Sequence, residues 1–115
     1  MELTKLVNEM DEMVKQGQIL EAVDKYFASS IKTKDHNGME TGDKKDVQTK
    51  LQGFLGGIQK VNGITLHGNS IGGNTSMSEF TFDFDMKDGS KVYWHEIIRR
   101  QWKNGMVTDE SYFKN

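Results

Sequence analysis

The chain contains no cysteine and no proline. Without cysteine it forms neither disulfides nor thiolate metal sites, and it has no thiolate nucleophile, although this leaves its compartment open. Without proline, the turns must be made by glycine and by other residues that tolerate positive φ, and the chain has 12 glycines. Glycine therefore marks most of the turns that this sequence predicts.

An excess of one charge is also missing, since 15 Lys and Arg stand against 17 Asp and Glu, for a formal net charge of −2. Such a balance gives no electrostatic case for a nucleic-acid or anionic-membrane partner. No segment approaches the ~20 consecutive apolar residues of a membrane span. The start, Met1-Glu2-Leu3-Thr4-Lys5, lacks the basic and apolar regions of a signal peptide. We therefore expect a cytoplasmic protein with no membrane or nucleic-acid partner.

The length of 115 residues suits one compact core and is too short for two, so residues 1–115 are expected to form a single domain. Helical periodicity fills the first half. It predicts one helix ending near Gly17, a second from about Gln18 to Ala28, and a third of about four turns after a cap at Asp43. The three apolar stripes are Leu3, Leu6, Val7, Met10, Met13 and Val14; Ile19, Val23, Tyr26 and Phe27; and Val47, Leu51, Phe54, Leu55, Ile58 and Val61.

A turn is predicted between the second and third helices. Ile31 to Lys34 suits a short strand, and Asp35-His36-Asn37-Gly38 ends in an Asn-Gly pair that tolerates positive φ. Glycines also interrupt the third helix, at Gly53, Gly56 and Gly57. Because each weakens a helix by up to ~1 kcal/mol relative to alanine, they indicate a bend or a close backbone contact.

From Gly63 onward the periodicity becomes two, which is typical of strands. Turns at Gly72-Gly73-Asn74, Asp88-Gly89 and Asn104-Gly105 predict an antiparallel meander. One strand shows the cleanest alternation of the whole chain, and its apolar residues define the buried face. They are Phe80, Phe82, Phe84 and Met86.

The next strand, Val92 to Trp102, has two candidate registers. A two-residue Asp88-Gly89 turn pairs Phe82 with His95, whereas a three-residue Lys87-Asp88-Gly89 loop pairs Phe82 with Trp94. The second register buries both tryptophans and Ile98. The first buries only Tyr93 and Ile97. We prefer the second, since a buried aromatic side chain removes roughly 150 to 250 Å² from water.

This register also turns a polar row inward. A two-residue Asn104-Gly105 turn then pairs Arg100 with Asp109 and places Phe113 opposite Glu96. The Arg100–Asp109 pair is interpreted as structural, with a clamp for an anionic ligand as the alternative. Glu96 is either an exposed or salt-bridged strand residue or a carboxyl group among aromatic rings, where desolvation would raise its pKa and suit it to proton transfer.

The order of these features resembles the nuclear transport factor 2-like superfamily, and specifically its SnoaL-like branch, which includes polyketide cyclases and ketosteroid isomerase. The resemblance spans nearly the whole chain. The motifs that carry it are Gly17-Gln18, Asp35-His36-Asn37-Gly38, Thr41-Gly42-Asp43-Lys44, and Arg99-Arg100-Gln101-Trp102-Lys103-Asn104-Gly105-Met106-Val107.

The resemblance implies a cystatin-like α+β fold, in which a cone-shaped curved antiparallel sheet wraps around three N-terminal helices and leaves a pocket between them. It implies that Trp102, three positions before the hairpin glycine, points inward, in agreement with the preferred register. It also implies a homodimer formed through the outer face of the sheet. That face would carry Tyr93, His95, Ile97 and Thr81.

Catalytic residues of the family carry over incompletely. Asp35 matches the proton-transferring aspartate of ketosteroid isomerase, but a turn aspartate more simply caps its own backbone. The isomerase's oxyanion tyrosine and second aspartate fall near Met10 and Ile98, which cannot donate a hydrogen bond to an oxyanion. We therefore do not expect steroid isomerase chemistry.

The candidate site combines these observations. Glu96 and Asp35 are the candidate catalytic groups, and no cofactor is implied. His36, His67 and His95 lack the spacing of metal ligands, so no metal site is expected. The residues expected to line a ligand pocket are Trp94, Ile98, Arg100, Trp102, Phe80, Phe82, Asp109, Tyr26 and Phe54.

Two functions follow. The first is a module that binds a small apolar or amphipathic molecule without catalysis. The alternative is a small cofactor-independent isomerase, cyclase or hydrolase that transfers protons with a pocket carboxylate. The first is preferred because the sequence shows no nucleophile, tautomer-fixing group or oxyanion donor arranged around either carboxylate.

Overall fold

Two short helices open the chain in the computed structural model, which describes residues 2–114. Helix α1 spans Leu3–Lys15 and helix α2 spans Ile19–Tyr26. Gly17, with φ of 84°, turns the chain between them, as the sequence predicts. The second helix ends earlier than expected, because Phe27 already starts strand β1, Phe27–Lys34, and is fully buried there. Here strand pairing and burial override helical periodicity.

The predicted turn follows β1. Gly38 has φ of 86°, and the Gly38 amide donates to the Asp35 carbonyl at 2.9 Å. The chain then pairs back on β1 as the short strand β2, Glu40–Gly42. Asn37, whose Oδ1 accepts from the Met39 amide at 3.0 Å, stabilises this turn with its side chain.

Helix α3 spans Lys44–Gly56, and Asp43 caps it by accepting from the Asp46 amide at 3.2 Å. The prediction that its stripe continues to Val61 is wrong, because strand β3 begins at Ile58. The glycines explain the early end. Gly57 makes the close backbone contact that they indicate: its carbonyl accepts from the Lys87 amide at 2.8 Å.

Four long strands complete the meander: β3 at Ile58–Gly72, β4 at Thr75–Met86, β5 at Lys91–Lys103 and β6 at Met106–Lys114. The preferred register between β4 and β5 is confirmed, because Phe82 pairs with Trp94 and Phe80 pairs with Glu96. The Lys87–Gly89 loop sets this register, with Gly89 at φ of 89°. Trp94, Glu96, Ile98, Arg100 and Trp102 therefore share the inner face.

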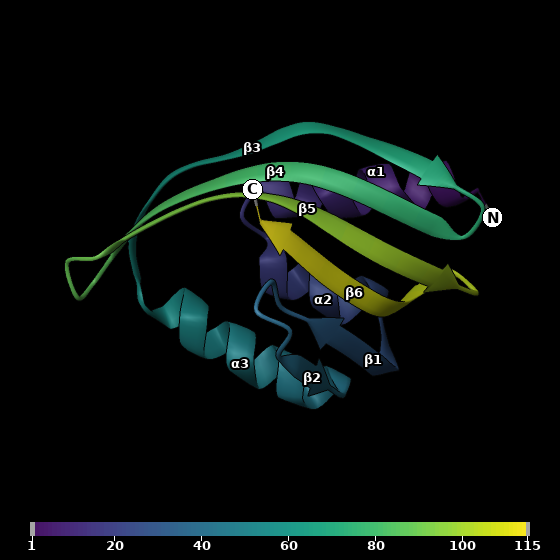
Figure 1. Cartoon of the computed structure of the whole chain (residues 1–115), viewed down its shortest axis with the longest axis horizontal. Coiled ribbons are helices and arrows are strands. Elements are labelled where there is room, and N and C mark those ends of the chain that lie inside the picture. Colours follow the sequence, from purple (N-terminus) through teal and green to yellow (C-terminus); the bar gives the residue numbers. More distant parts are fainter. Residues whose placement is uncertain (1, 115) are drawn as a thin grey trace.

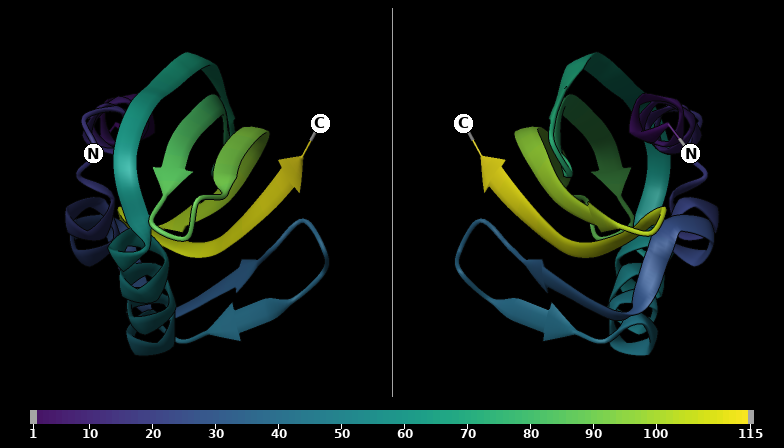
Figure 2. Two further views of the ribbon diagram at one scale, coloured as in Figure 1. Left: turned by 90° about the vertical axis from the view of Figure 1, so that its left-hand side faces the viewer. Right: turned by 90° about the vertical axis from the view of Figure 1, so that its right-hand side faces the viewer.

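The six strands form one sheet in the order β2-β1-β6-β5-β4-β3. Neighbouring strands are antiparallel except β1 and β6, which are parallel. Figure 1 shows β3, β4 and β5 arching together, with α3 and the β1–β2 hairpin below them. In Figure 2 the sheet curves around the side on which the helices lie. The expected α+β architecture is thus confirmed, although α3 follows the first two strands.

The core fills the space between the helices and the concave face of the sheet. The apolar faces of all three helices and the inner faces of β1, β4, β5 and β6 contribute to it, which is the packing that an amphipathic helix on a one-sided sheet requires. Among residues 2–114, no helix is long and apolar enough to cross a bilayer. The buried apolar side chains are Val7, Met10, Val14, Ala22, Val23, Tyr26, Phe27, Ile31, Val47, Phe80, Phe82, Phe84, Ile98, Trp102 and Val107.

Candidate functional site

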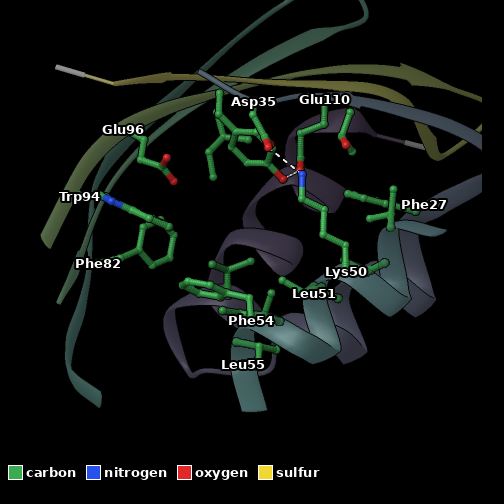
Figure 3. A pocket seen from close by; sticks show the side chains of 18 of the residues that line it. Phe27, Asp35, Lys50, Leu51, Phe54, Leu55, Phe82, Trp94, Glu96 and Glu110 are labelled. Carbon is green, nitrogen blue, oxygen red and sulfur yellow. Dashed lines mark hydrogen bonds and ion pairs between the residues drawn. The ribbon is translucent and has the colours of Figure 1, made fainter. Parts of the chain in front are cut away.

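A cavity of about 250 Å³ lies between helix α3, helix α2 and the inner face of the sheet. Figure 3 shows α3 presenting Leu51, Phe54 and Leu55 to it from one side, with Trp94 and Glu96 opposite. Its wall is mostly apolar, as is usual for pockets that take small molecules. The ionisable side chains of the wall are Asp35, His36, Lys50, Glu96, Arg100, Glu110 and Tyr112.

Aromatic rings form the wall below Glu96. Phe54 stacks on Trp94, with ring centroids 5.4 Å apart and an interplanar angle of 17°. Phe54 also meets Phe84 edge-on at 6.1 Å, and Phe82 lies 6.0 Å from Phe84. Ring pairs at these separations stabilise one another beyond simple burial. The rings therefore make a fixed apolar surface for a guest.

Glu96 points into the cavity from the middle of β5 (Figure 3). It is 7% exposed, and within residues 2–114 no hydrogen bond or ion pair joins its carboxyl group to another side chain. Burial raises the pKa of Glu96 to about 7. Lys114 opposes this rise, whereas the negative charges of Glu110 and Asp35 add to it. Glu96 is therefore poised to gain or lose a proton near neutral pH.

Arg100 lies at the back of the cavity and is 1% exposed. Its Nη1 donates to Oδ1 of Asp11 at 2.7 Å, and its Nε donates to Oε2 of Glu110 at 2.9 Å. Asp11 also accepts from Ser78 Oγ at 2.6 Å and from Asn69 Nδ2 at 2.9 Å. The guanidinium charge is thus matched by two carboxylates, which ties helix α1 to strands β5 and β6.

The expected Arg100–Asp109 pair is wrong. Thr108 is an extra residue in β6 that has no partner in β5. Trp102 pairs with Val107, but its neighbour Gln101 pairs with Asp109, so the register shifts by one residue between these two pairs. Beyond this bulge Arg100 faces Glu110, and Asp109 is exposed. The same shift places Lys114 opposite Glu96, and Phe113, expected inside, is 53% exposed.

Asp35 lines the cavity mouth, where its Oδ2 lies 2.6 Å from Nζ of Lys50. Lys50 also donates to Thr41 Oγ1 at 3.4 Å. The interpretation of Asp35 as a side-chain cap of its own turn is wrong, because Asn37 takes that part. The carboxylate of Asp35 is already engaged by an ammonium group and is therefore less available to a guest.

The structure brings together most of the predicted pocket. Trp94, Ile98, Phe82 and Phe54 line the cavity with the polar groups described above. Three predicted residues are buried beside the cavity without lining it, namely Phe80, Trp102 and Tyr26.

These buried residues have structural contacts of their own. Trp102 donates from Nε1 to Ser76 Oγ at 2.9 Å, and its ring meets Tyr26 edge-on at 6.0 Å. The Tyr26 hydroxyl donates to Glu9 at 2.9 Å, and burial with this hydrogen bond raises the pKa of Tyr26 to about 12. They support the wall from behind.

The polar residues of this region that were not predicted include Asp11, Lys50, Glu110 and Tyr112. Two of them carried a signal, because Asp11 and Lys50 lie on the apolar stripes of their helices, at four and three residues from Val7 and Val47. Glu110 and Tyr112 face the cavity because the bulge at Thr108 shifts the register of β6. Tyr112 donates its hydroxyl to Glu110, and burial raises the pKa of Tyr112 well above its ordinary value.

Metal ligation finds no support in the part of the chain that the structure describes. In residues 2–114 no cluster of three or more His, Asp or Glu side chains is arranged to hold a metal ion. The side chains that line the cavity can form hydrogen bonds and ion pairs and can transfer protons.

Several solved structures share this architecture. A protein from Mesorhizobium loti, provisionally named a SnoaL-like polyketide cyclase, is 25% identical with a TM-score of 0.87, over 98% of this chain and 99% of that chain. One of the same provisional name from Jannaschia is 8% identical with a TM-score of 0.79, over 96% and 86%. An LEH-like epoxide hydrolase from M. tuberculosis is 12% identical with a TM-score of 0.76, over 96% and 80%.

The sequence itself gave no such match. Comparison with protein-family models found none, and comparison with curated proteins found none either. Structural similarity at 8% and 12% identity establishes the fold alone. What the cavity does must therefore be argued from its own residues.

Proposed function

Because the chain belongs to the nuclear transport factor 2-like superfamily and resembles its SnoaL-like members, we propose that its cavity binds a small apolar or amphipathic molecule. The observation that carries this proposal is the aromatic wall beside the buried and unpaired carboxyl group of Glu96. Its apolar surface supplies affinity by excluding water, and the carboxyl group orients the guest. Binding without catalysis is preferred because Arg100 and Lys50 are already paired with carboxylates.

Toluene and benzyl alcohol test this proposal, since one is apolar and the other amphipathic. Either should shift the NMR signals of cavity residues at submillimolar to millimolar concentration. Leu51→Trp fills the cavity from α3 and should abolish the shifts, whereas Leu20→Trp makes the same change on α2 at a residue outside the lining. Unchanged spectra of the wild-type protein with both probes would contradict the proposal.

A second candidate function is proton-transfer catalysis by Glu96, as in a small cofactor-independent isomerase, cyclase or hydrolase. Its support is the carboxyl group with a pKa near neutrality in a mostly apolar cavity. Asp35 is the weaker candidate because Lys50 holds it. Exchange of the α-protons of cyclohexanone in D2O measures the activity. Exchange that exceeds the buffer rate and is lost in Glu96→Gln supports it; exchange at the buffer rate contradicts it.

We also propose that two copies associate through the outer face of the sheet. Several large apolar side chains are exposed there, which is unusual unless a partner covers them. Ile97→Lys should convert a dimer to a monomer in solution scattering, whereas Met39→Lys, at an exposed methionine of the Asp35 turn, should not. A monomeric wild-type protein would refute this. The exposed residues on this face are Met77, Tyr93, Ile97 and Phe113.

A further inference from the structure

We propose that the guest of the cavity is an organic cation: an ammonium group on a small apolar frame, with its charge matched by Glu96. This inference rests on the proposed binding function and adds the chemical class of the ligand. It follows from the charges of the wall, from the rings beside Glu96 and from the size of the space.

The charged side chains of the wall are already paired with one another or with neighbouring residues, with one exception. Lys50 lies 2.6 Å from Asp35. Arg100 is held by Asp11 at 2.7 Å and Glu110 at 2.9 Å. The two permanent cations of the described lining therefore have no charge to spare for an anionic guest. An anion would meet three carboxyl groups here and no uncommitted ammonium or guanidinium group.

Glu96 is the exception. No hydrogen bond or ion pair within residues 2–114 engages its carboxyl group. In the same part of the chain, no fully buried polar side-chain atom lacks a hydrogen-bond partner. The carboxyl oxygens of Glu96 must therefore open onto the cavity, as Figure 3 shows. A guest that brings a positive charge or a donor to this place supplies the missing partner.

The aromatic wall favours the same class of guest. Phe82, Phe84 and Phe54 lie in contact around the space below Glu96, and a cation within about 6 Å of a ring centroid is attracted by the ring's electrons. The chain already uses this attraction at the rim. Nζ of Lys114 lies over Trp94, 4.6 Å from the ring centroid. Lys114 is also the residue of β6 that pairs with Glu96 across the sheet.

The volume limits the guest to a small frame. An apolar cavity of ~150 Å³ accommodates benzene. At about 250 Å³, this one has room for a ring that carries a methylated ammonium group. Phenyltrimethylammonium fits this description, and tert-butylbenzene has the same shape without the charge.

The experiment compares these two probes by NMR titration of the full chain. At pH 8 the wild-type protein should bind phenyltrimethylammonium at least about tenfold more tightly than tert-butylbenzene. Glu96→Gln keeps the shape of the side chain but not its charge, and should remove this preference. Glu21→Gln makes the same change at an exposed residue of α2 and should leave the preference intact.

The pH profile adds a readout that a purely structural role of Glu96 would not move. Because the bound charge favours the ionised carboxyl group, affinity for phenyltrimethylammonium should rise as pH increases through about 7. The groups that face Glu96 and share its field are Lys114, Glu110 and Tyr112 on β6, Asp35 and His36 in the turn, Lys50 on α3 and Arg100 on its own strand.

The outcomes separate the two proposals. A preference for the ammonium probe that vanishes in Glu96→Gln and grows with pH supports the inference. If tert-butylbenzene binds as tightly as the cation, the ligand class is wrong while the binding function stands. If neither these probes nor toluene and benzyl alcohol bind, both proposals fail.

Discussion

Individual residues decide the chemistry of this cavity, and Glu96 is the clearest case. Its side chain differs from the other acids of the wall because no basic group reaches it closely: Lys50 takes Asp35, and Arg100 takes Glu110. Desolvation then outweighs the opposing charge of Lys114, and the protonated form gains. Glu96 is therefore close to half-protonated near neutral pH.

This difference predicts how stability depends on pH. The Glu96 pKa rises from 4.5 to about 7 on folding, so between these values the folded state holds a proton that the unfolded state has lost. The free energy of unfolding should therefore fall as pH increases through this window. Glu96→Gln should remove the penalty, raising stability at pH 8 by up to about 3 kcal/mol and at pH 4 by little.

Urea denaturation of both proteins at the two pH values measures this effect, with Glu21→Gln as the control for a lost surface carboxylate. NMR titration of the Glu96 carboxyl group checks the cause directly. A value close to the ordinary ~4.3 of glutamate would show that the side chain is hydrated, and the stabilisation at pH 8 should then be absent.

At the scale of secondary-structure elements, strand register determines which side chains contact each other, and the bulge in β6 sets this register. One extra residue, Thr108, exchanges the partner of Arg100 from Asp109 to Glu110. Because side chains alternate along a strand, a shift of one residue exchanges the buried and exposed sets. The loop of Lys87–Gly89 acts in the same way between β4 and β5, where it selects Trp94 and Glu96 for the inside.

Deletions separate a bulge residue from a ladder residue. Removing Thr108 should leave Arg100 opposite Glu110, since Asp109 still pairs with Gln101, and the protein should remain folded. Removing His95, an outer-face residue of β5, should turn either Trp94 or Glu96 outward and unfold the protein or destabilise it by several kcal/mol.

Circular dichroism and cross-strand NOEs between β5 and β6 report the outcome for each deletion. Loss of the Arg100 to Glu110 pairing in the Thr108 deletion would mean that the bulge itself holds the register. Native stability of the His95 deletion would show that the β4–β5 register can slip without cost.

At the scale of the whole molecule, the sheet and the helices contribute unequally. Strands β3 to β6 pair over most of their lengths, whereas α3 has one fully buried residue, Val47, and carries two glycines before its last turn ends. Helix α3 also forms one side of the cavity (Figure 3). Local opening is expected where buried apolar contact is sparse. We therefore expect a guest to enter the cavity through α3.

Hydrogen exchange tests this route. Amides of α3 should exchange faster than those of the central strand β5, and saturating toluene should slow exchange in α3 more than elsewhere, because a guest stabilises the closed form. Gly53→Ala, at a position with open space around its added methyl group, should slow opening by strengthening the helix. Equal protection of α3 and β5 would contradict an entrance at α3.

The sequence alone determined the class of fold, the Phe-rich inner row and the β4–β5 register, because alternation and burial of two tryptophans act locally and in the same direction. It also singled out Glu96. It misplaced the ends of α2 and α3, since Phe27 and Ile58 suit helix periodicity but gain more by strand pairing. Element boundaries that depend on such competition are not encoded in spacing.

Only the tertiary structure decided which acids meet Arg100. Asp11 lies on a helix, 89 residues from Arg100 in the sequence. Glu110 faces Arg100 because of a bulge that no turn-forming residue in the sequence indicates. Ion pairs of this kind depend on three-dimensional distance, and a one-residue shift in one strand is enough to change them. The sequence thus supplied the carboxyl group of the cavity, and the fold left it without an ion-pair partner, because Lys50 and Arg100 of the cavity wall pair with other acids.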